Sequence, residues 1–363
     1  MLFTPATIGK LELKNRLVRS ATAERMADAQ GKPLPQLVGL LERLARGGVG
    51  LIISGHLYVH PTGRAHAEMT GIYADELIPD LKSLTDAVHS ADGKIVAQIN
   101  HAGMHSNAPE LSEKIAPSDV SPPYIETPAR AMTAIEIETL VDAFAQAARR
   151  AQQAGFDGVQ IHGAHGYLVS QFLSSYINQR SDKWGGSFQN RLCFLSAVTF
   201  AIRAQVGPEY PVLIKLGMMD GIEGGLALAE GAQVVAQLAE MGIDGIEISS
   251  GLGGKKLPRS KGIRKPADEA YFLPFARAAR PLTNLPLILV GGFRSLGVMQ
   301  QTLHSGMIDF ISICRPLIND PEFPNKLRIG TIEQSACISA NNCWPKNTGD
   351  GIACKCPLEK ISS

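Results

Sequence analysis

The fold is decided by one segment, Gly158-Val-Gln-Ile-His162-Gly-Ala-His165-Gly166-Tyr167. A short apolar run opens directly onto two histidines and a tyrosine, a pattern typical of a buried strand and its carboxyl end. α/β barrels keep their active sites at this end of their strands. Imidazole N–H groups can bind a substrate oxygen and a phenol can deliver a proton, so the segment predicts a site for a carbonyl compound. The alternative, histidines that only satisfy core backbone groups, is less favoured because three such side chains lie close together.

Similar apolar runs recur along the whole chain, and each is followed by a helical stretch. Eight strands are expected, at Arg16–Ala21, Val49–Gly55, Ile95–Asn100, Gly158–His162, Val212–Leu216, Gly245–Ser250, Leu287–Gly291 and Phe310–Cys314. Eight alternating units predict an α/β fold with a single (β/α)8 TIM barrel. We expect the barrel to occupy residues 1–330, and residues 331–363 to form a short cysteine-containing tail packed on or near it.

One helix and two loops are especially well marked. Thr133 and Glu136 form a capping box, and Gly155 stops the helix that they begin, so we expect a helix from Thr133 to Ala154. The longest irregular stretches, 104–132 and 253–267, follow the third and sixth strands. They should therefore lie at the catalytic face as substrate loops or lids.

Composition narrows the class of partner. The chain has 363 residues, 45% of them hydrophobic, and a formal net charge of only +1. Its basic residues are scattered, which argues against a nucleic-acid or membrane-surface binder. The N-terminal segment has no signal-peptide pattern and no long apolar span occurs, so we expect a cytoplasmic protein whose partner is a small molecule.

The ends of the later strands favour a phosphate site. Gly291 and Gly292 follow the seventh strand and Arg315 follows the eighth. Barrels commonly bind phosphate here on backbone N–H groups, and an arginine adds charge-assisted hydrogen bonds. The alternative for Arg315 is a surface salt bridge.

Two further polar side chains leave apolar strands. Lys215 should face a negative or electron-rich ligand atom, although a structural ion pair with a nearby carboxylate is the alternative. Gln98 offers both a donor and an acceptor, which suits the edge of a heterocycle.

At these residues the chain resembles the old yellow enzyme family of FMN-dependent NAD(P)H oxidoreductases. The resemblance runs from Leu13 to about Leu327. The matching motifs, in order, are Leu13-Lys-Asn-Arg-Leu-Val-Arg-Ser-Ala21, Pro61-Thr-Gly-Arg64, Gln98-Ile-Asn-His-Ala-Gly103, Ile161-His-Gly-Ala-His-Gly-Tyr-Leu168 with Gln171-Phe-Leu, Asn178-Gln-Arg-Ser-Asp-Lys-Trp-Gly-Gly-Ser187 with Asn190-Arg191, and Asp309-Phe-Ile-Ser-Ile-Cys-Arg-Pro-Leu317 with Asp320-Pro321.

The resemblance implies a flavin site and a substrate site. FMN would be held by Ser20, Ala21, Thr22, Ala23, Gly55, Gln98, Lys215, Gly291, Gly292, Cys314 and Arg315. Among them, Gln98 would bind the pyrimidine side, Lys215 would lie near N1 and O2, and the residues from Gly291 onward would hold the phosphate end.

The resemblance also implies an ene-reductase reaction. NADH or NADPH would reduce FMN, and an enone or related activated alkene would then take hydride from flavin N5 at its β-carbon. His162 and His165 would bind the carbonyl oxygen, and Tyr167 would protonate the α-carbon. Members of the family often form homo-oligomers, so we expect one here.

Several positions depart from the family pattern. They are Ala23 for a frequent Thr or Cys, Met104 for a frequent Arg, Lys215 for Arg, Trp184 for Tyr and Cys314 for Gly. They make the substrate pocket harder to predict than the cofactor site. We interpret Trp184 as a packing variant.

The cysteines of the tail resemble an incomplete cluster motif. Larger relatives carry Cys-x2-Cys-x2 or 3-Cys and a later fourth Cys, whereas this chain has Cys337, Ala340, Cys343 and then Cys354. Cys356 is the one candidate to replace the missing ligand. A four-iron cluster normally needs four thiolates. We therefore expect a degenerate site and no iron–sulfur cluster or other metal, with a zinc site as a lesser alternative.

Two rival functions remain open at this point. One is a barrel lyase or isomerase that uses His162, His165 and Tyr167 for enolisation without flavin. The other is a flavin electron-transfer component, or a dienoyl-CoA-reductase-like enzyme, with a cluster in the tail.

Overall fold

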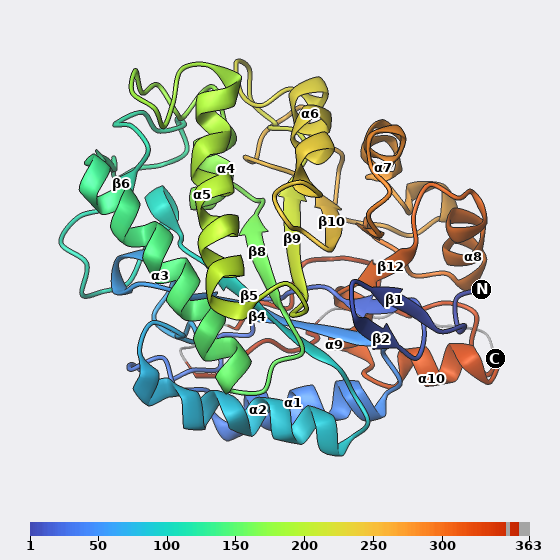
Figure 1. The fold of residues 1–363 in the computed structure, drawn as a ribbon. Helices are drawn as coiled ribbons and strands as arrows, with labels where there is room; N and C mark the ends of the chain where they lie inside the picture. The colour runs from blue at the N-terminus through green and yellow to red at the C-terminus, as the bar shows by residue number, and fades with distance from the viewer. Residues whose placement is uncertain (346–348, 356–363) are drawn as a thin grey trace.

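A computed structural model describes residues 1–345 and 349–355, and within them eight parallel strands form a closed barrel (Figure 1). Helices surround the strands on the outside of the barrel. The barrel strands are β3 (Leu17–Arg19), β4 (Leu51–Tyr58), β5 (Ile95–Asn100), β8 (Val159–Gly163), β9 (Val212–Gly217), β10 (Gly245–Ser249), β11 (Leu287–Val290) and β12 (Phe310–Ile313). Each pairs with its neighbours in chain order, and β12 returns to β3. The predicted (β/α)8 barrel is confirmed.

The helices follow the strands as a barrel requires. They are α1 (Pro35–Arg46), α2 (Ile78–Ser90), α3 (Ala134–Gln153), α4 (Leu168–Leu173), α5 (Phe188–Val206), α6 (Leu228–Leu238), α7 (Leu273–Ala279), α8 (Leu296–His304), α9 (Arg315–Asn319) and α10 (Phe323–Arg328). The capping box of α3 is present, because the Thr133 hydroxyl accepts from the Glu136 backbone and the Glu136 carboxylate accepts from the Thr133 backbone. The predicted helix after Thr133 is thus confirmed.

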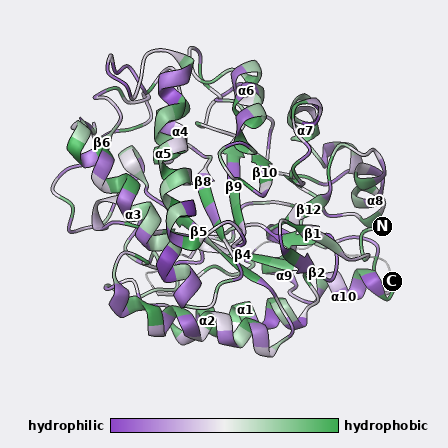
Figure 2. Ribbon diagram, viewed as in Figure 1, coloured by the Kyte–Doolittle hydropathy of each residue, from purple (hydrophilic) through white to green (hydrophobic). Residues whose placement is uncertain are grey.

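Burial explains why the strands are so apolar. Both faces of a parallel strand are covered, one by the barrel interior and one by helices, and every residue of β5, β8, β9 and β10 is buried. Figure 2 shows these strands as largely hydrophobic, whereas α2 and α3 carry both hydrophobic and hydrophilic bands. At the amino-terminal end of the barrel, the antiparallel hairpin of β1 (Ala6–Ile8) and β2 (Leu11–Leu13) packs against interior side chains. That end is therefore closed, and the opposite end carries the polar residues.

Strand β4 differs most from the expected strands. It continues to Tyr58, three residues beyond the predicted end. Ile53 pairs with Val96 and His56 with Gln98, so three steps along β4 match two steps along β5. An extra residue in one strand is a β-bulge, and it turns the following side chain in a new direction. The bulge turns the His56 side chain toward the barrel interior at the carboxyl end of β4.

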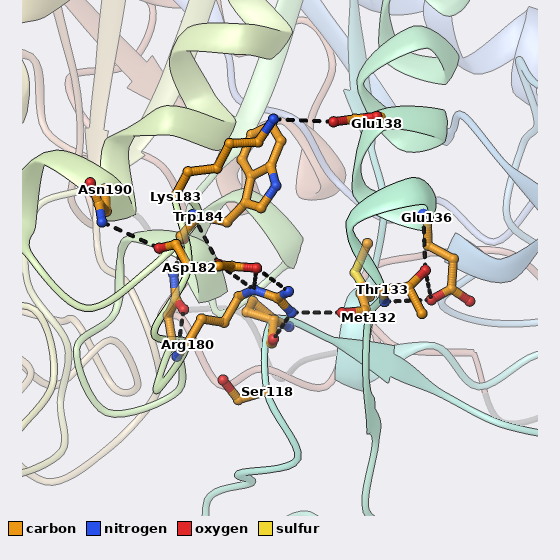
Figure 3. Close-up of polar contacts among 12 residues, drawn as sticks. Ser118, Met132, Thr133, Glu136, Glu138, Arg180, Asp182, Lys183, Trp184 and Asn190 are labelled. Carbon is orange, nitrogen blue, oxygen red and sulfur yellow. Dashed lines mark hydrogen bonds and ion pairs between the residues drawn. The ribbon is translucent and has the colours of Figure 1, made fainter.

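The two long loops lie where the strand order requires, after β5 and β10. The first includes a short parallel pair, β6 (Ile115–Ala116) and β7 (Arg130–Ala131). Arg180 ties this loop to the segment after α4, because its guanidinium donates to the backbone oxygens of Pro117 and Met132 and pairs with Asp182 (Figure 3). The hydrogen bond from Arg180 holds the pKa of Asp182 below its usual range. This part of the family motif therefore fixes a loop beside the catalytic face.

The described part of the tail lies against the barrel. Ser335 N donates to the Arg294 backbone oxygen, Gly262 N to that of Ser339, and Ile352 N to that of Glu24. Cys356 lies outside the described residues. Among the described residues, no three His, Cys, Asp or Glu side chains lie close enough together to hold a metal ion. No described helix combines the length and apolarity needed to cross a bilayer.

Candidate active site

A cleft opens at the carboxyl ends of the barrel strands. Its lining is Ala21, Thr22, Ala23, His56, Gln98, His162, His165, Tyr167, Lys215 and Trp344. All of these except His56 and Trp344 are residues that the sequence singled out. The structure thus brings together side chains from β5, β8, β9 and the segment after β3.

A hydrogen-bonded network, here called the polar floor, lies in the barrel interior beside the cleft. It consists of Ser20, Gln98, Gln160, Lys215, Glu247 and Ser312, each no more than 2% exposed. Lys215 Nζ lies 2.7 Å from Ser20 Oγ and 3.0 Å from Glu247 Oε1. The structural ion pair considered for Lys215 is therefore present, and Lys215 lines the cleft as well.

Glu247 is the centre of the polar floor. Its carboxylate accepts hydrogen bonds from Ser20 Oγ at 2.7 Å, Ser312 Oγ at 2.8 Å and Gln160 Nε2 at 3.1 Å. Burial acts to raise the pKa of Glu247, but the Lys215 charge and these hydroxyls outweigh it and hold the pKa below its usual range. Gln98 completes the chain, because its Nε2 donates to Gln160 Oε1 at 2.7 Å. The buried Glu247 carboxylate thus accepts four hydrogen bonds, one of them from Lys215 Nζ.

A second group of side chains, here called the imidazole wall, consists of His56, His66, His162, His165 and Tyr167. The ring centroids of His162 and Tyr167 are 4.8 Å apart, and those of His162 and His165 are 5.2 Å apart. The His56 ring lies 5.2 Å from the Tyr167 ring and 5.7 Å from the His66 ring. The sequence-predicted triplet therefore forms one cluster, and two further histidines join it.

Burial sets the protonation states of this wall. It lowers the pKa of His162 well below its ordinary value and that of His56 to about 3, so both rings are neutral at pH 7. It raises the pKa of Tyr167 to about 12, so the phenol keeps its proton. Neutral imidazoles and a protonated phenol can all donate hydrogen bonds or a proton.

Some polar atoms of this wall have no partner. Within the described residues, His162 Nδ1, His56 Nε2 and the neighbouring Asn100 Oδ1 are buried without a hydrogen bond. His165 is different, because its Nε2 lies 2.8 Å from Ser249 Oγ and its backbone has a positive φ of 58°. Buried polar groups in native proteins are seldom left unpaired. The unpaired atoms mark the part of the cleft that a ligand would complete.

A smaller cavity adjoins the cleft near β11 and β12. Its lining includes Gly292, Cys314, Arg315 and Ser339. Gly292 has a φ of 75°, which favours glycine, and Thr22 Oγ1 lies 3.0 Å from Cys314 Sγ, linking the linings of the two cavities. Arg315 Nη1 donates to the Ser260 oxygen and to Asn341 Oδ1, both of them uncharged acceptors.

The remaining cofactor candidates lie behind these linings. Gly55 forms part of the β4 bulge, and its N–H donates to Glu24 Oε1 at 3.1 Å. A Cβ on Gly55 would meet the Glu24 carboxylate, so only glycine fits. A Cβ on Gly291 would lie 3.2 Å from the Tyr271 nitrogen, which leaves little room there.

Sequence reasoning missed several residues of the site. Glu247 is a charged residue within an apolar strand that follows the strand of Lys215, and this was a usable signal because a buried charge needs a partner. His56 follows Ser54 and Gly55, and glycine within a strand often marks a bulge. Trp344 had no comparable signal, because its position depends on how the tail folds back.

The residues present fit an FMN molecule. Lys215 and Gln98 offer polar atoms for the edge of a heterocycle, and Ala21 and Ala23 leave room for a flat ring. Gly292 and Arg315 in the adjoining cavity suit a phosphate. The unpaired atoms of the imidazole wall lie on the remaining side.

Comparison with known proteins gives the same family along nearly the whole chain. Residues 1–334 match the NADH:flavin oxidoreductase / NADH oxidase family. The chain is 33% identical to NADH oxidase of Thermoanaerobacter brockii, over 99% of this chain and 56% of that protein. It is 32% identical to 4,4'-dithiodibutanoate disulfide reductase of Rhodococcus erythropolis, over 95% and 92% of the two chains.

Solved structures agree with the sequence relatives. The old yellow enzyme homologue from Zymomonas mobilis superposes with a TM-score of 0.79 at 28% identity, covering 96% of this chain and 98% of that one. 2-Naphthoyl-CoA reductase gives a TM-score of 0.85 at 31% identity, covering 94% of this chain and 54% of that one. The chain thus spans about half the length of some relatives and nearly all of others. It belongs to the NADH:flavin oxidoreductase / NADH oxidase family, the family of the old yellow enzymes.

Proposed function

We propose that the chain is an FMN-dependent NAD(P)H oxidoreductase that reduces the C=C bond of α,β-unsaturated carbonyl compounds. The observation that carries the proposal is the convergence of His162, His165 and Tyr167 on the cleft that Lys215 and Gln98 also line. When bound, FMN would accept two electrons from NADH or NADPH and supply hydride to the β-carbon of the substrate.

FMN would be held by three groups of residues. Lys215 and Gln98 would contact the pyrimidine side, and Ser20 to Ala23 would lie along the ring. Gly291, Gly292, Cys314 and Arg315 would surround the phosphate. Lys215 is well suited because its ammonium group donates hydrogen bonds to Glu247 and Ser20 and has a third N–H group for an acceptor on the ligand.

The imidazole wall would act on the substrate. His162 and His165, whose rings are in contact, would bind the carbonyl oxygen, and neutral imidazole N–H groups would stabilise the negative charge that develops there. Tyr167 lies against His162 and keeps its proton up to high pH, so it can protonate the α-carbon. Different side chains would thus bind the carbonyl oxygen and protonate the α-carbon.

The test is a pair of half-reactions. Protein loaded with FMN is mixed without oxygen with NADPH or NADH, and the visible flavin absorbance should bleach. Adding 2-cyclohexenone should restore the absorbance and yield cyclohexanone, whereas cyclohexanone itself, the matched control without the C=C bond, should not. Protein that binds no FMN, or that is reoxidised equally by both ketones, would contradict the proposal. A colourless protein would favour the flavin-free lyase or isomerase instead.

A further inference from the structure

His56 is aimed into the cleft by the bulge in β4. Ser54 and Gly55 provide the extra residue, and the bulge is fixed on both sides. Ser54 Oγ accepts from Gln98 N at 3.0 Å, and Gly55 N donates to Glu24 Oε1. Bulges next to active sites commonly redirect a side chain. His56, only 6% exposed, consequently lies in the lining of the cleft beside Tyr167.

The tautomer of His56 follows from its contact with Asn100. Asn100 Nδ2 lies 3.1 Å from His56 Nδ1, and an amide nitrogen can only donate. With the Asn100 amide oriented as it is in the structure, Nδ1 accepts, and in a neutral ring the proton is then on Nε2. His56 thus presents an N–H donor.

This donor has no acceptor within the described chain. His56 Nε2 is buried and makes no hydrogen bond. The rings around it, those of His66, His162 and Tyr167, have centroids 5.2 to 6.1 Å away. An unpaired buried donor is costly, so an acceptor supplied by a ligand is expected.

We propose that His56 is a third imidazole donor of the active site, and that its Nε2–H binds a carbonyl or oxyanion oxygen of the ligand in the cleft. This inference rests on the proposed function, since it needs FMN and a carbonyl substrate to bind there. The oxygen can belong to the flavin or to the substrate. In either case His56 contributes to ligand selection beyond His162 and His165.

The experiment compares three variants with the wild type. H56F keeps a planar ring without the N–H, and H56Q restores a donor. H105F is the matched control, because the His105 ring also contacts Tyr167, with a centroid distance of 6.0 Å, but is not in the cleft lining. Two dissociation constants are measured for each protein: FMN with the flavin-free protein, and a phenolate with the FMN-saturated protein.

A loss in either constant supports the proposal and identifies the source of the oxygen. H56F should weaken FMN if the acceptor is on the flavin, or the phenolate if it is on the substrate, by about tenfold or more in either case. H56Q should stay within about threefold of the wild type, and H105F should leave both constants unchanged.

Three results would overturn the proposal. They are H56F binding both ligands as the wild type does, H56Q binding as weakly as H56F, or H105F showing the same loss. If H56F does not fold, ¹⁵N spectra of histidine-labelled wild-type protein show which ring nitrogen of His56 carries the proton. The His56 signal is assigned by its loss in H56Q. A proton on Nε2 supports the proposal and one on Nδ1 overturns it. Wild-type protein that binds no FMN would refute the proposed function together with this inference, so the two failures are distinguishable.

Discussion

The polar floor and the imidazole wall meet at one cleft, yet they satisfy their hydrogen bonds differently. In the floor, the charged Lys215 and Glu247 are paired with each other and with hydroxyl and amide groups. In the wall, His56 Nε2 and His162 Nδ1 are buried without partners in the described residues. A paired buried charge stabilises the fold, whereas an unpaired buried polar atom is available to a ligand. In the flavin-free protein, variants of the Lys215–Glu247 pair should therefore change stability, whereas variants of the wall should change binding and turnover.

The largest effect is expected from breaking the charge pair of the floor. K215M leaves Glu247, fully buried, without its counter-charge, and should lower the free energy of unfolding of the flavin-free protein by about 3–5 kcal/mol. The double variant K215M/E247Q removes both charges and should regain most of this loss. Urea unfolding measures all three proteins. K82M, which breaks the exposed pair with Asp86, is the control and should cost no more than about 0.5 kcal/mol. A K215M protein as stable as the wild type would show that the floor is not a structural network.

A large effect of the other kind is expected from Tyr167. Y167F removes the phenolic proton and should lower enone-dependent turnover at least about 100-fold. Its free energy of unfolding should change by less than about 1 kcal/mol, because the Tyr167 side chain packs on its described neighbours through ring contacts, which phenylalanine keeps. Single-turnover reoxidation of the reduced enzyme separates this step from cofactor reduction, which Y167F should leave intact. Turnover within about threefold of wild type would remove Tyr167 as the proton donor.

A smaller effect comes from pH. The pKa of His56 is lowered to about 3 in the folded chain, so below pH 6.5 the unfolded chain takes up a proton that the folded chain does not. The contribution of neutral His56 to the free energy of unfolding is therefore complete above pH 6.5. It falls as the pH falls, by up to about 1.4 kcal/mol per pH unit, and the same holds for each other histidine whose pKa is lowered by folding. Unfolding of flavin-free protein between pH 6.5 and 4.5 measures this slope. H56F should make it shallower, and an unchanged slope in H56F would show that His56 is not buried in the neutral form.

The smallest effect is expected away from both regions. R180M removes the hydrogen bonds from Arg180 to the oxygens of Pro117 and Met132 and its pair with Asp182. We expect about 0.5–1.5 kcal/mol less stability and a higher KM for the enone, with unchanged FMN binding, because the loop borders the catalytic face. Steady-state kinetics and an FMN titration test this, and a loss of FMN affinity would place the loop closer to the cofactor than we propose.

Local sequence patterns were enough to predict the barrel and part of the site. Each strand is an apolar run with a polar end, so the sequence alone places His162, Gln98 and Lys215 at one rim. Contacts between distant segments could not be read in this way. Glu247 belongs to the floor only because β9 and β10 are in direct register, and His56 faces the cleft only because β4 is bulged. Trp344 reaches the cleft through a tail whose Ile352 binds the segment at Glu24.

The most direct test of this account is a phenolate titration of the FMN-loaded protein. On the proposed function, a phenolate would occupy the position of the substrate oxygen, and a long-wavelength charge-transfer band with the flavin would report its binding. The wild type should show a saturable band, and H162A and H165A should each lose it, while E247Q, a floor variant, should keep it once FMN is bound. A band that persists in both histidine variants would contradict the assignment of the imidazole wall to the substrate.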